Sequence, residues 1–525
     1  MNKLLKKLKS LKSSSAINKT DLLIIGLGLF VFVSIALLTI TKSSIWFDEA
    51  YGAYMIKFNF LDIVRYTAND IHPPFFYWLL KLWSMCFGNS EFALRSMSVF
   101  FGGVSIVFGY LLSNRLFNKN VARVSLIFMV LSPMFIRYSQ EARMYTLMTA
   151  IALIATYILT FAINTKKKLL WVVYGILVGL GMLTHYFMAV IWVAHWLWRA
   201  DIFRRQFSGL KFFKKFFSSD WIISHVIAVI VFLPWVYYFL RQILSVQVGG
   251  FWIQPITPST VVNFFTNSIY YQDVSNTTGW LSLIFMVLLI GMILLAIRVN
   301  RQLNSFDKQS YRLILSITFV PIVLIFLASL PPLRSAFVDR YLIPSTVGLS
   351  IFIGATLVFG LKGLKTRWQI LAVALFAGLM MIGISNVWVV GNFNKNMGQS
   401  NIARQVIELI KANSEEGQPI VVESPFSLFE FAFYESDNRP VFFIEEDKYK
   451  KMGSLDMLKY NDDHKIKDEP EFSRSNPVVW YVAYQGANDL IPPISNCSVS
   501  KRLFMNDPIT NKTAYQIIEC LTGAH

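Results

Sequence analysis

Long apolar stretches alternate with short polar segments along most of this chain of 525 residues. A run of about 20 apolar residues is long enough to cross the hydrocarbon core of a bilayer as a helix. The pattern therefore predicts a polytopic α-helical membrane protein. About eleven transmembrane helices are expected, near residues 22–41, 92–113, 120–137, 144–163, 169–184, 186–199, 221–240, 279–298, 312–330, 341–360 and 369–390.

Composition supports this prediction, because 55% of the residues are hydrophobic and only 15% are charged. A soluble protein carries about 25% charged residues. The net charge of +18 does not indicate nucleic acid as a partner, because most basic residues lie in short loops between apolar runs. The partners expected from composition are membrane lipids.

The distribution of basic residues also predicts the orientation of the chain. Loops rich in Lys and Arg stay in the cytoplasm, and the basic segment 1–20 suits a cytoplasmic N-terminus. With that start, every inner loop is basic and nearly free of acids, and an odd number of spans places the C-terminus outside. The inner basic residues are Arg115, Lys119, Arg123, Lys166, Lys167, Lys168, Arg199, Arg204, Arg205, Lys211, Lys214, Lys215, Arg298, Arg301, Lys308, Arg312, Lys362, Lys365 and Arg367.

Two outer segments interrupt the pattern of spans. In the first outer loop, 42–91, residues 73–83 are amphipathic and rich in aromatics, which is typical of a helix lying in the membrane interface. An aromatic belt alone is an equally simple interpretation. The segment 21–391 is then the transmembrane domain, and 392–525 has the composition of a separate soluble domain.

The C-terminal segment alternates between strand-like and helical patterns, so a small extracytoplasmic α/β domain is expected. Strands are predicted near 419–422, 440–444, 478–484 and 514–520, and helices near 401–412, 428–434 and 455–460. No catalytic motif is visible there, which favours a binding or shielding role. Whether Cys497 and Cys520 pair is left open by the sequence.

The first candidate for chemistry is the acidic pair Asp48-Glu49, directly after the first apolar run. Charge at a membrane boundary is costly and tends to mark function. A carboxylate there could act as general base toward a hydroxyl. The alternative is a solvated pair that caps an interfacial helix.

Three further outer segments carry candidate residues. Glu141 and Arg143, between the third and fourth expected helices, could position an acceptor or cation and contact a phosphate, or form an ordinary ion pair. His72, before two prolines, could donate to an anionic leaving group or be a plain surface histidine. Arg340, at the entry to the tenth helix, offers the planar fork that suits phosphate, or serves as a snorkelling anchor.

His185 lies at the outer end of the fifth expected helix. Together with Glu141 it could form a partial metal site, although two ligands are a weak signal. A divalent cation is therefore possible, and no cofactor is required by the sequence.

The order of these motifs resembles the GT-C glycosyltransferases. Within them it is most similar to the bacterial branch of protein O-mannosyltransferases, which are family 39-like enzymes, and to the aminoarabinose transferases of lipid A. The likeness covers about residues 20–390. The residues that carry it are Asp48-Glu49, His72-Pro73-Pro74, Arg95-Ser96, Gln140-Glu141-Ala142-Arg143 and Asp339-Arg340-Tyr341.

The resemblance implies a polyprenyl-phosphate sugar as donor and transfer on the extracytoplasmic face of the cell membrane. Asp48 matches the catalytic base of the family, and Glu49 matches the acid that helps to hold the acceptor. Glu141 falls where the family has a second outer-loop acid, and Arg340 falls near the late arginine that binds the lipid phosphate. The acceptor is a protein, a lipid or a polysaccharide.

The chain differs from these families in two respects, which limit the residue roles that the resemblance implies. Aminoarabinose transferases have Glu-Lys-Pro where this chain has Ile71-His72-Pro73, so the metal-ligating glutamate is absent. Loop 241–278 is too short for the β-trefoil insertion of protein mannosyltransferases. A lipid-linked sugar flippase or transporter is the alternative function. Charges near the middle of the spans would favour it, but the central parts of the spans are largely uncharged. A scaffold that presents the C-terminal domain would leave the outer motifs unexplained.

Overall fold

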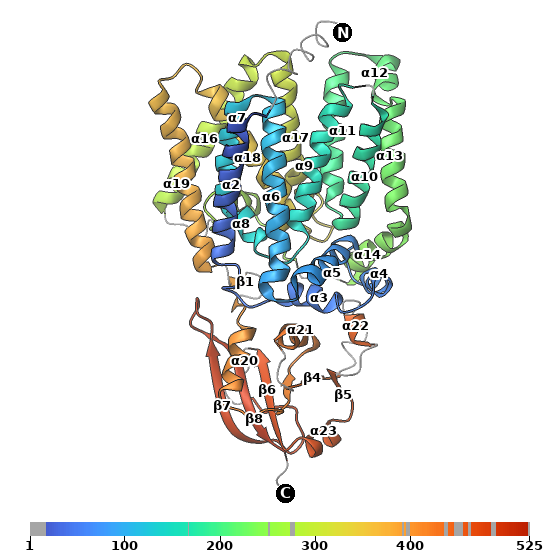
Figure 1. The fold of residues 1–525 in the computed structure, drawn as a ribbon, viewed down its shortest axis with the longest axis vertical. Coiled ribbons are helices and arrows are strands. Elements are labelled where there is room, and N and C mark those ends of the chain that lie inside the picture. The colour runs from blue at the N-terminus through green and yellow to red at the C-terminus, as the bar shows by residue number, and fades with distance from the viewer. Residues whose placement is uncertain are drawn as a thin grey trace. The chain divides into compact units, whose positions relative to one another are not determined.

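The chain divides into two compact units in a computed structural model (Figure 1). The first unit comprises Met1–Leu38 and Arg95–Trp388, and the second comprises Thr39–Leu94 and Val389–His525. The structure describes residues 17–165, 167–249, 253–273, 279–390, 393–394, 399–434, 439–445, 455–459, 464–484 and 490–522. The basic residues of 1–16 and Lys166 lie outside this description. The first outer loop and the C-terminal segment therefore belong to the same unit.

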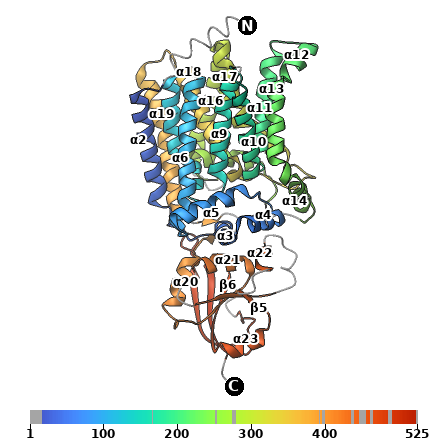
Figure 2. The ribbon, with the colours of Figure 1, turned by 45° about the vertical axis from the view of Figure 1, so that its right-hand side comes forward.

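The first unit is a bundle of helices (Figures 1 and 2). In the described part of the chain, eight helices are long and apolar enough to cross a membrane, or nine if one bent pair counts as a single span. The multi-pass helical architecture is thus confirmed, whereas the count of eleven transmembrane helices stays a prediction. The helices are α2 (Lys19–Leu38), α6 (Glu91–Leu116), α7 (Lys119–Leu131), α8 (Pro133–Ser139), α9 (Tyr145–Ala162), α10 (Lys168–Thr184), α11 (Met188–Arg204), α12 (Gly209–Phe216), α13 (Ser219–Phe232), η1 (Leu233–Trp235), α14 (Val236–Gly249), α15 (Thr260–Ile269), α16 (Gly279–Gln302), α17 (Ser305–Leu327), η3 (Asp339–Leu342), α18 (Ile343–Gly360) and α19 (Thr366–Val390).

The expected helix at 120–137 is broken by Pro133. Ser132 adopts an extended conformation, with φ −64° and ψ 110°, and Pro133 opens α8. The residue before a proline is driven out of helical geometry, and proline is well tolerated at the first position of the next helix. The two helices meet at a bend of 58°, which turns α8 and the following segment 140–144 away from the direction of α7.

Close helix contacts in the bundle depend on small residues. A Cβ at Gly175 of α10 would collide with the backbone oxygen of Ser224 on α13, and one at Gly354 of α18 would collide with the Ser125 hydroxyl on α7. Small residues let helices approach closely in a membrane. The outer motifs on α8, α9 and η3 are therefore held by a tightly packed frame.

In the second unit, the first outer loop folds into three short helices. These are α3 (Phe47–Met55), α4 (Phe60–Asn69) and α5 (Phe75–Phe87). The Asn59 side chain caps α4 by accepting the backbone N–H groups of Leu61 and Asp62 at 3.0 and 2.9 Å. Helix α5 contains the amphipathic aromatic segment that was expected to be helical.

The C-terminal part of the second unit contains a mixed six-stranded sheet in the order β5-β4-β3-β6-β8-β7. Strands β5, β4, β3 and β6 run parallel, whereas β8 is antiparallel to both β6 and β7. The strands are β3 (Ile420–Val422), β4 (Val441–Ile444), β5 (Lys465–Ile466), β6 (Val478–Tyr484), β7 (Ser498–Asn506) and β8 (Thr513–Leu521), and a separate pair consists of β1 (Phe393–Asn394) and β2 (Gln399–Ser400). The helices are α20 (Ala403–Lys411), α21 (Pro425–Phe433), α22 (Asp456–Lys459) and α23 (Glu469–Ser475).

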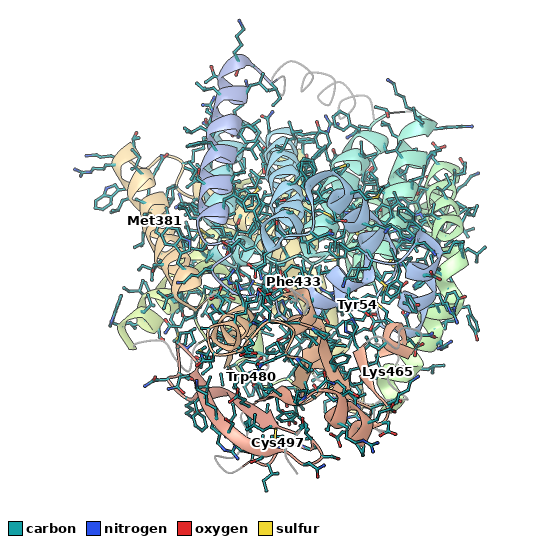
Figure 3. All side chains as sticks on the ribbon, turned by 60° about the horizontal axis from the view of Figure 1, so that its bottom comes forward. Tyr54, Met381, Phe433, Lys465, Trp480 and Cys497 are labelled. Atoms are coloured by element: carbon teal, nitrogen blue, oxygen red, sulfur yellow. A yellow bond between two sulfur atoms is a disulfide. The ribbon has the colours of Figure 1, made fainter. Side chains whose placement is uncertain are left out.

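Four of these strands coincide with predicted strands, whereas β5 and β7 were missed. Strand β7 is a sheet edge with mostly exposed residues, so it lacks the apolar signal on which strand prediction depends. Cys497, just before β7, is disulfide-bonded to Cys520 of β8, next to the buried core of the sheet. Cys497 and the buried Trp480 of β6 are labelled in Figure 3.

Candidate active site

Asp48 and Glu49 occupy the first turn of α3. The N-terminus of a helix carries partial positive charge and favours nearby carboxylates. Glu49 is buried, and its Oε2 accepts the backbone N–H of Trp46 at 3.4 Å, so it caps the helix that contains it. Asp48 is only partly buried, which makes its carboxylate the more accessible of the two.

A third carboxyl lies beside this pair, and the sequence did not reveal it. Glu430 of α21 is 6% exposed, and it accepts the backbone N–H of Phe47 at the start of α3. The pKa of Glu430 is raised from 4.5 to about 8, mainly by burial; the Phe47 N–H opposes this rise, and the charges of Glu49 and Asp48 contribute to it. Glu430 is therefore mainly protonated at neutral pH.

His72 precedes α5 and is oriented by a neighbouring acid. Its Nδ1 lies 3.2 Å from Oδ2 of Asp70, and both side chains are largely buried. A carboxylate on one ring nitrogen fixes the orientation of an imidazole. Asp70 is therefore a partner of His72 that the sequence interpretation did not single out.

In the first unit, Glu141 and Arg143 lie between α8 and α9. Glu141 is buried and forms an ion pair with Arg137, with Arg137 Nη1 3.2 Å from Glu141 Oε2. Arg143 is 2% exposed, and its carbonyl accepts the Ser98 hydroxyl at 3.2 Å. The Glu/Arg ion pair considered from the sequence thus forms with Arg137.

Arg340 lies in η3 and is buried among aromatic rings. Its guanidinium carbon is 5.9 Å from the ring centre of Tyr145 and 5.8 Å from that of Tyr341. The preceding residue, Asp339, accepts the side-chain amide of Asn267 at 2.8 Å, and the same amide donates to Asp273 at 2.9 Å. A buried arginine is suited to an anionic ligand.

His185 packs against the same aromatic residues. Its ring centre lies 4.9 Å from that of Tyr341 and 6.1 Å from that of Tyr145. Its Nδ1 accepts the backbone N–H of Phe187 at 3.3 Å. Tyr145 and Tyr341 thus join His185 and Arg340 into one cluster.

The two residues of the metal site considered from the sequence each have a partner within the chain. The Glu141 carboxylate is held by Arg137, and His185 Nδ1 is occupied by a backbone N–H. Within the described ranges, no three His, Cys, Asp or Glu side chains gather as metal ligands would. A metal role for Glu141 and His185 therefore stays a prediction.

The candidate residues thus fall into two groups, one in each unit. Asp48, Glu49 and His72 belong to the second unit, where α21 adds Glu430. The first unit contains Glu141, Arg143, His185 and Arg340.

Comparison with known proteins relates the chain to sugar transferases. Residues 71–238 match the family model of dolichyl-phosphate-mannose-protein mannosyltransferase. The undecaprenyl phosphate-alpha-4-amino-4-deoxy-L-arabinose arabinosyl transferase of Pseudomonas savastanoi pv. phaseolicola is 28% identical over 172 residues, which are 31% of this chain and 30% of that protein. The chain spans about a third of the length of the curated relatives that it matches.

Solved structures extend the likeness over nearly the whole chain. ArnT from Cupriavidus metallidurans in the apo state has a TM-score of 0.59 at 11% identity, over 95% of this chain and 97% of ArnT. The same protein bound to undecaprenyl phosphate has a TM-score of 0.56 at 13% identity, over 96% of this chain and 98% of that one. The chain is therefore a multi-pass helical membrane protein with the GT-C fold of ArnT, and the resemblance inferred from its motifs is confirmed.

Proposed function

We propose that the chain is a membrane glycosyltransferase that moves a sugar from a polyprenyl-phosphate donor to an acceptor hydroxyl. The observation that carries this proposal is the partly buried Asp48 on the first turn of α3, in a chain with sequence similarity to arabinosyl transferases. The relative's name specifies an undecaprenyl-phosphate sugar, and ArnT of the same fold binds undecaprenyl phosphate.

Asp48 is the general base in the proposed reaction. It takes the proton of the acceptor hydroxyl as that oxygen bonds to the anomeric carbon. The bond between the anomeric carbon and the phosphate oxygen breaks, and its electron pair stays on the lipid phosphate. One direct displacement of this kind inverts the configuration at the anomeric carbon.

Basic side chains would bind the phosphate and stabilise it as it leaves. Arg340 and Arg143 are assigned this role, because each is a buried arginine in one of the outer motifs. His72, oriented by Asp70, is assigned a hydrogen bond to the same group. Glu141 supports the site through Arg137, and no step requires a metal.

The proposed arrangement in the membrane follows from loop charge. The basic loops of the eleven-span interpretation lie on the cytoplasmic side, with the N-terminus, in the cell membrane. Loop 42–91 and the C-terminal domain then lie outside, where a protein, lipid or polysaccharide acceptor is available. Transfer on that face requires the donor's sugar headgroup to be exposed there.

Mass spectrometry of a strain that lacks this chain tests the function. The proposal expects a polyprenyl-phosphate sugar to accumulate while one envelope glycan or glycoprotein loses a single sugar residue. If all lipid-linked sugars and glycans are unchanged, the proposal is wrong. A lipid-linked sugar that accumulates only on the inner leaflet would instead indicate the flippase alternative.

A further inference from the structure

The C-terminal α/β part packs directly on the helix that carries Asp48. The ring of Phe429 on α21 lies 5.8 Å from the Tyr51 ring and 5.1 Å from the Tyr54 ring of α3. Phe426 of α21 lies 5.3 Å from Phe47. The two helices are adjacent in both ribbon views (Figures 1 and 2), and Tyr54 is labelled in Figure 3.

Helix α21 is itself anchored to the sheet. Phe431 is fully buried, and its ring packs edge-on against Tyr515 of β8 at 5.7 Å. Ser424 caps the helix by accepting the backbone N–H of Ser427 at 3.3 Å. The sheet therefore supports the helix that contacts α3.

Two carboxyl groups satisfy the first backbone N–H groups of α3. The first N–H groups of a helix have no partner within the helix. Glu49 accepts from Trp46, and Glu430 of α21 accepts from Phe47. Because burial keeps Glu430 mainly protonated, it accepts this hydrogen bond without adding a third full charge beside Asp48.

The segment just before α3 is held by the same part of the chain. The backbone N–H of Ile45 donates to the Tyr434 hydroxyl at 2.6 Å. Ser44 donates its N–H to the carbonyl of Asn401 at 3.1 Å and its hydroxyl to Gln405 Oε1 at 2.7 Å. The start of α3 is thus fixed by contacts from α21 and from the region of α20.

We propose that the C-terminal α/β part positions the candidate base, with Glu430 as the positioning residue that fixes the start of α3 and the direction of Asp48. This role is more specific than the binding or shielding role expected from the sequence. The effect of this positioning role on kcat rests on the proposed function, whereas the structural coupling between Glu430 and α3 does not.

Hydrogen–deuterium exchange of the full-length protein in detergent tests the coupling without an activity assay. Glu430→Ala is expected to speed exchange of the Phe47–Ala50 amides by at least about 10-fold, because a lost hydrogen bond of about 1.4 kcal/mol corresponds to that factor. Glu430→Gln retains a carbonyl acceptor and is expected to exchange like the wild type. Exposed Glu471 of α23 is the matched control, and Glu471→Ala should change nothing at α3.

Two outcomes would overturn the proposal. Unchanged exchange at Phe47–Ala50 in Glu430→Ala would show that Glu430 does not hold α3. Equal acceleration in β6 would show that Glu430 serves the folding of the sheet rather than the placement of α3. Rescue by Glu430→Gln separates loss of the hydrogen bond from loss of side-chain volume.

Donor-consumption kinetics then test the effect on Asp48. A misplacement of about 1 Å can reduce a rate by about 100-fold, so Glu430→Ala should lower kcat by about 10- to 100-fold with KM for the donor unchanged. Glu430→Gln should restore kcat. A raised KM with unchanged kcat would contradict a positioning role. If the wild type consumes no donor, the proposed function fails, while the exchange result still decides the structural coupling.

Discussion

Arg404 of α20 donates to Glu91 at the start of α6, with Arg404 Nη1 2.9 Å from Glu91 Oε2. The other terminal nitrogen of the same guanidinium donates to the carbonyl of Thr41 at 3.0 Å. Thr41 and Glu91 lie at the two ends of the first outer loop, so one arginine joins both ends. Glu91 also accepts the hydroxyl of Tyr434.

Removing this arginine should loosen the loop. Arg404→Ala leaves the largely buried carboxylate of Glu91 with one partner fewer, and hydrogen bonds to charged groups contribute about 1.5–3 kcal/mol each. We expect a lower midpoint of thermal unfolding for the purified protein. Arg474→Ala, at an exposed arginine of α23, is the control and should have little effect.

A double mutant separates this ion pair from general destabilisation. Because Arg404 and Glu91 interact directly, the loss in Arg404→Ala/Glu91→Gln should be smaller than the sum of the single losses. Strict additivity of the two changes would contradict the proposed coupling.

The buried Glu430 should make stability depend on pH. The unfolded chain releases this proton near pH 4.5, whereas the folded protein retains it until about pH 8. The unfolded state therefore binds fewer protons in that window, and stability falls as pH rises from about 4.5 to about 8.

Glu430→Gln removes this titration. Its midpoint of thermal unfolding should exceed that of the wild type by an amount that grows from pH 5 to pH 8. The same scan on Glu471→Gln provides the control. A difference between Glu430→Gln and wild type that is constant over this range would show that Glu430 does not titrate there.

The membrane architecture could be predicted from the sequence, and Asp48 could be singled out as a candidate, because both depend on local pattern. Apolar runs mark spans wherever they occur, and an acidic pair after the first run is visible without knowledge of the fold. Pro133, which breaks the third expected helix, is also visible in the sequence, but the apolar run continues on both sides of it and hides the break.

Glu430 could not be found in the same way. It is a single acid inside the apolar segment Pro425–Phe433, with no motif around it. Its importance depends on a contact with Phe47, which is distant in the sequence. The capping role of Glu49 was more accessible, because an acid three residues after the residue that precedes a helix is a typical capping pattern.

Arg340 should determine affinity for the donor phosphate. Arg340→Lys keeps a positive charge but loses the planar fork, so KM for the polyprenyl-phosphate donor should rise by about 10-fold or more, as expected for one lost charged hydrogen bond. Exposed Arg334 is the control, and Arg334→Lys should leave KM unchanged. An unchanged KM in Arg340→Lys would remove this residue from the phosphate site.

The disulfide provides a test of orientation. Disulfides persist outside the cytoplasm, so Cys497 and Cys520 should be bonded in cells if the C-terminal domain is outside. After denaturation, a maleimide should label one thiol per chain, Cys86, which is free, and three thiols after reduction. Three labelled thiols without reduction would contradict an extracytoplasmic domain.

The role of Asp48 is tested most directly by Asp48→Asn. Membranes that contain this variant are supplied with the lipid extract of a strain that lacks the chain, and consumption of the lipid-linked sugar is followed by mass spectrometry. Asp62→Asn, in the first turn of α4, is the matched control. General-base catalysis contributes about 100- to 10,000-fold, so Asp48→Asn should consume donor at least about 100-fold more slowly, while Asp62→Asn matches the wild type. Wild-type consumption by Asp48→Asn would contradict the assignment of Asp48 as the base.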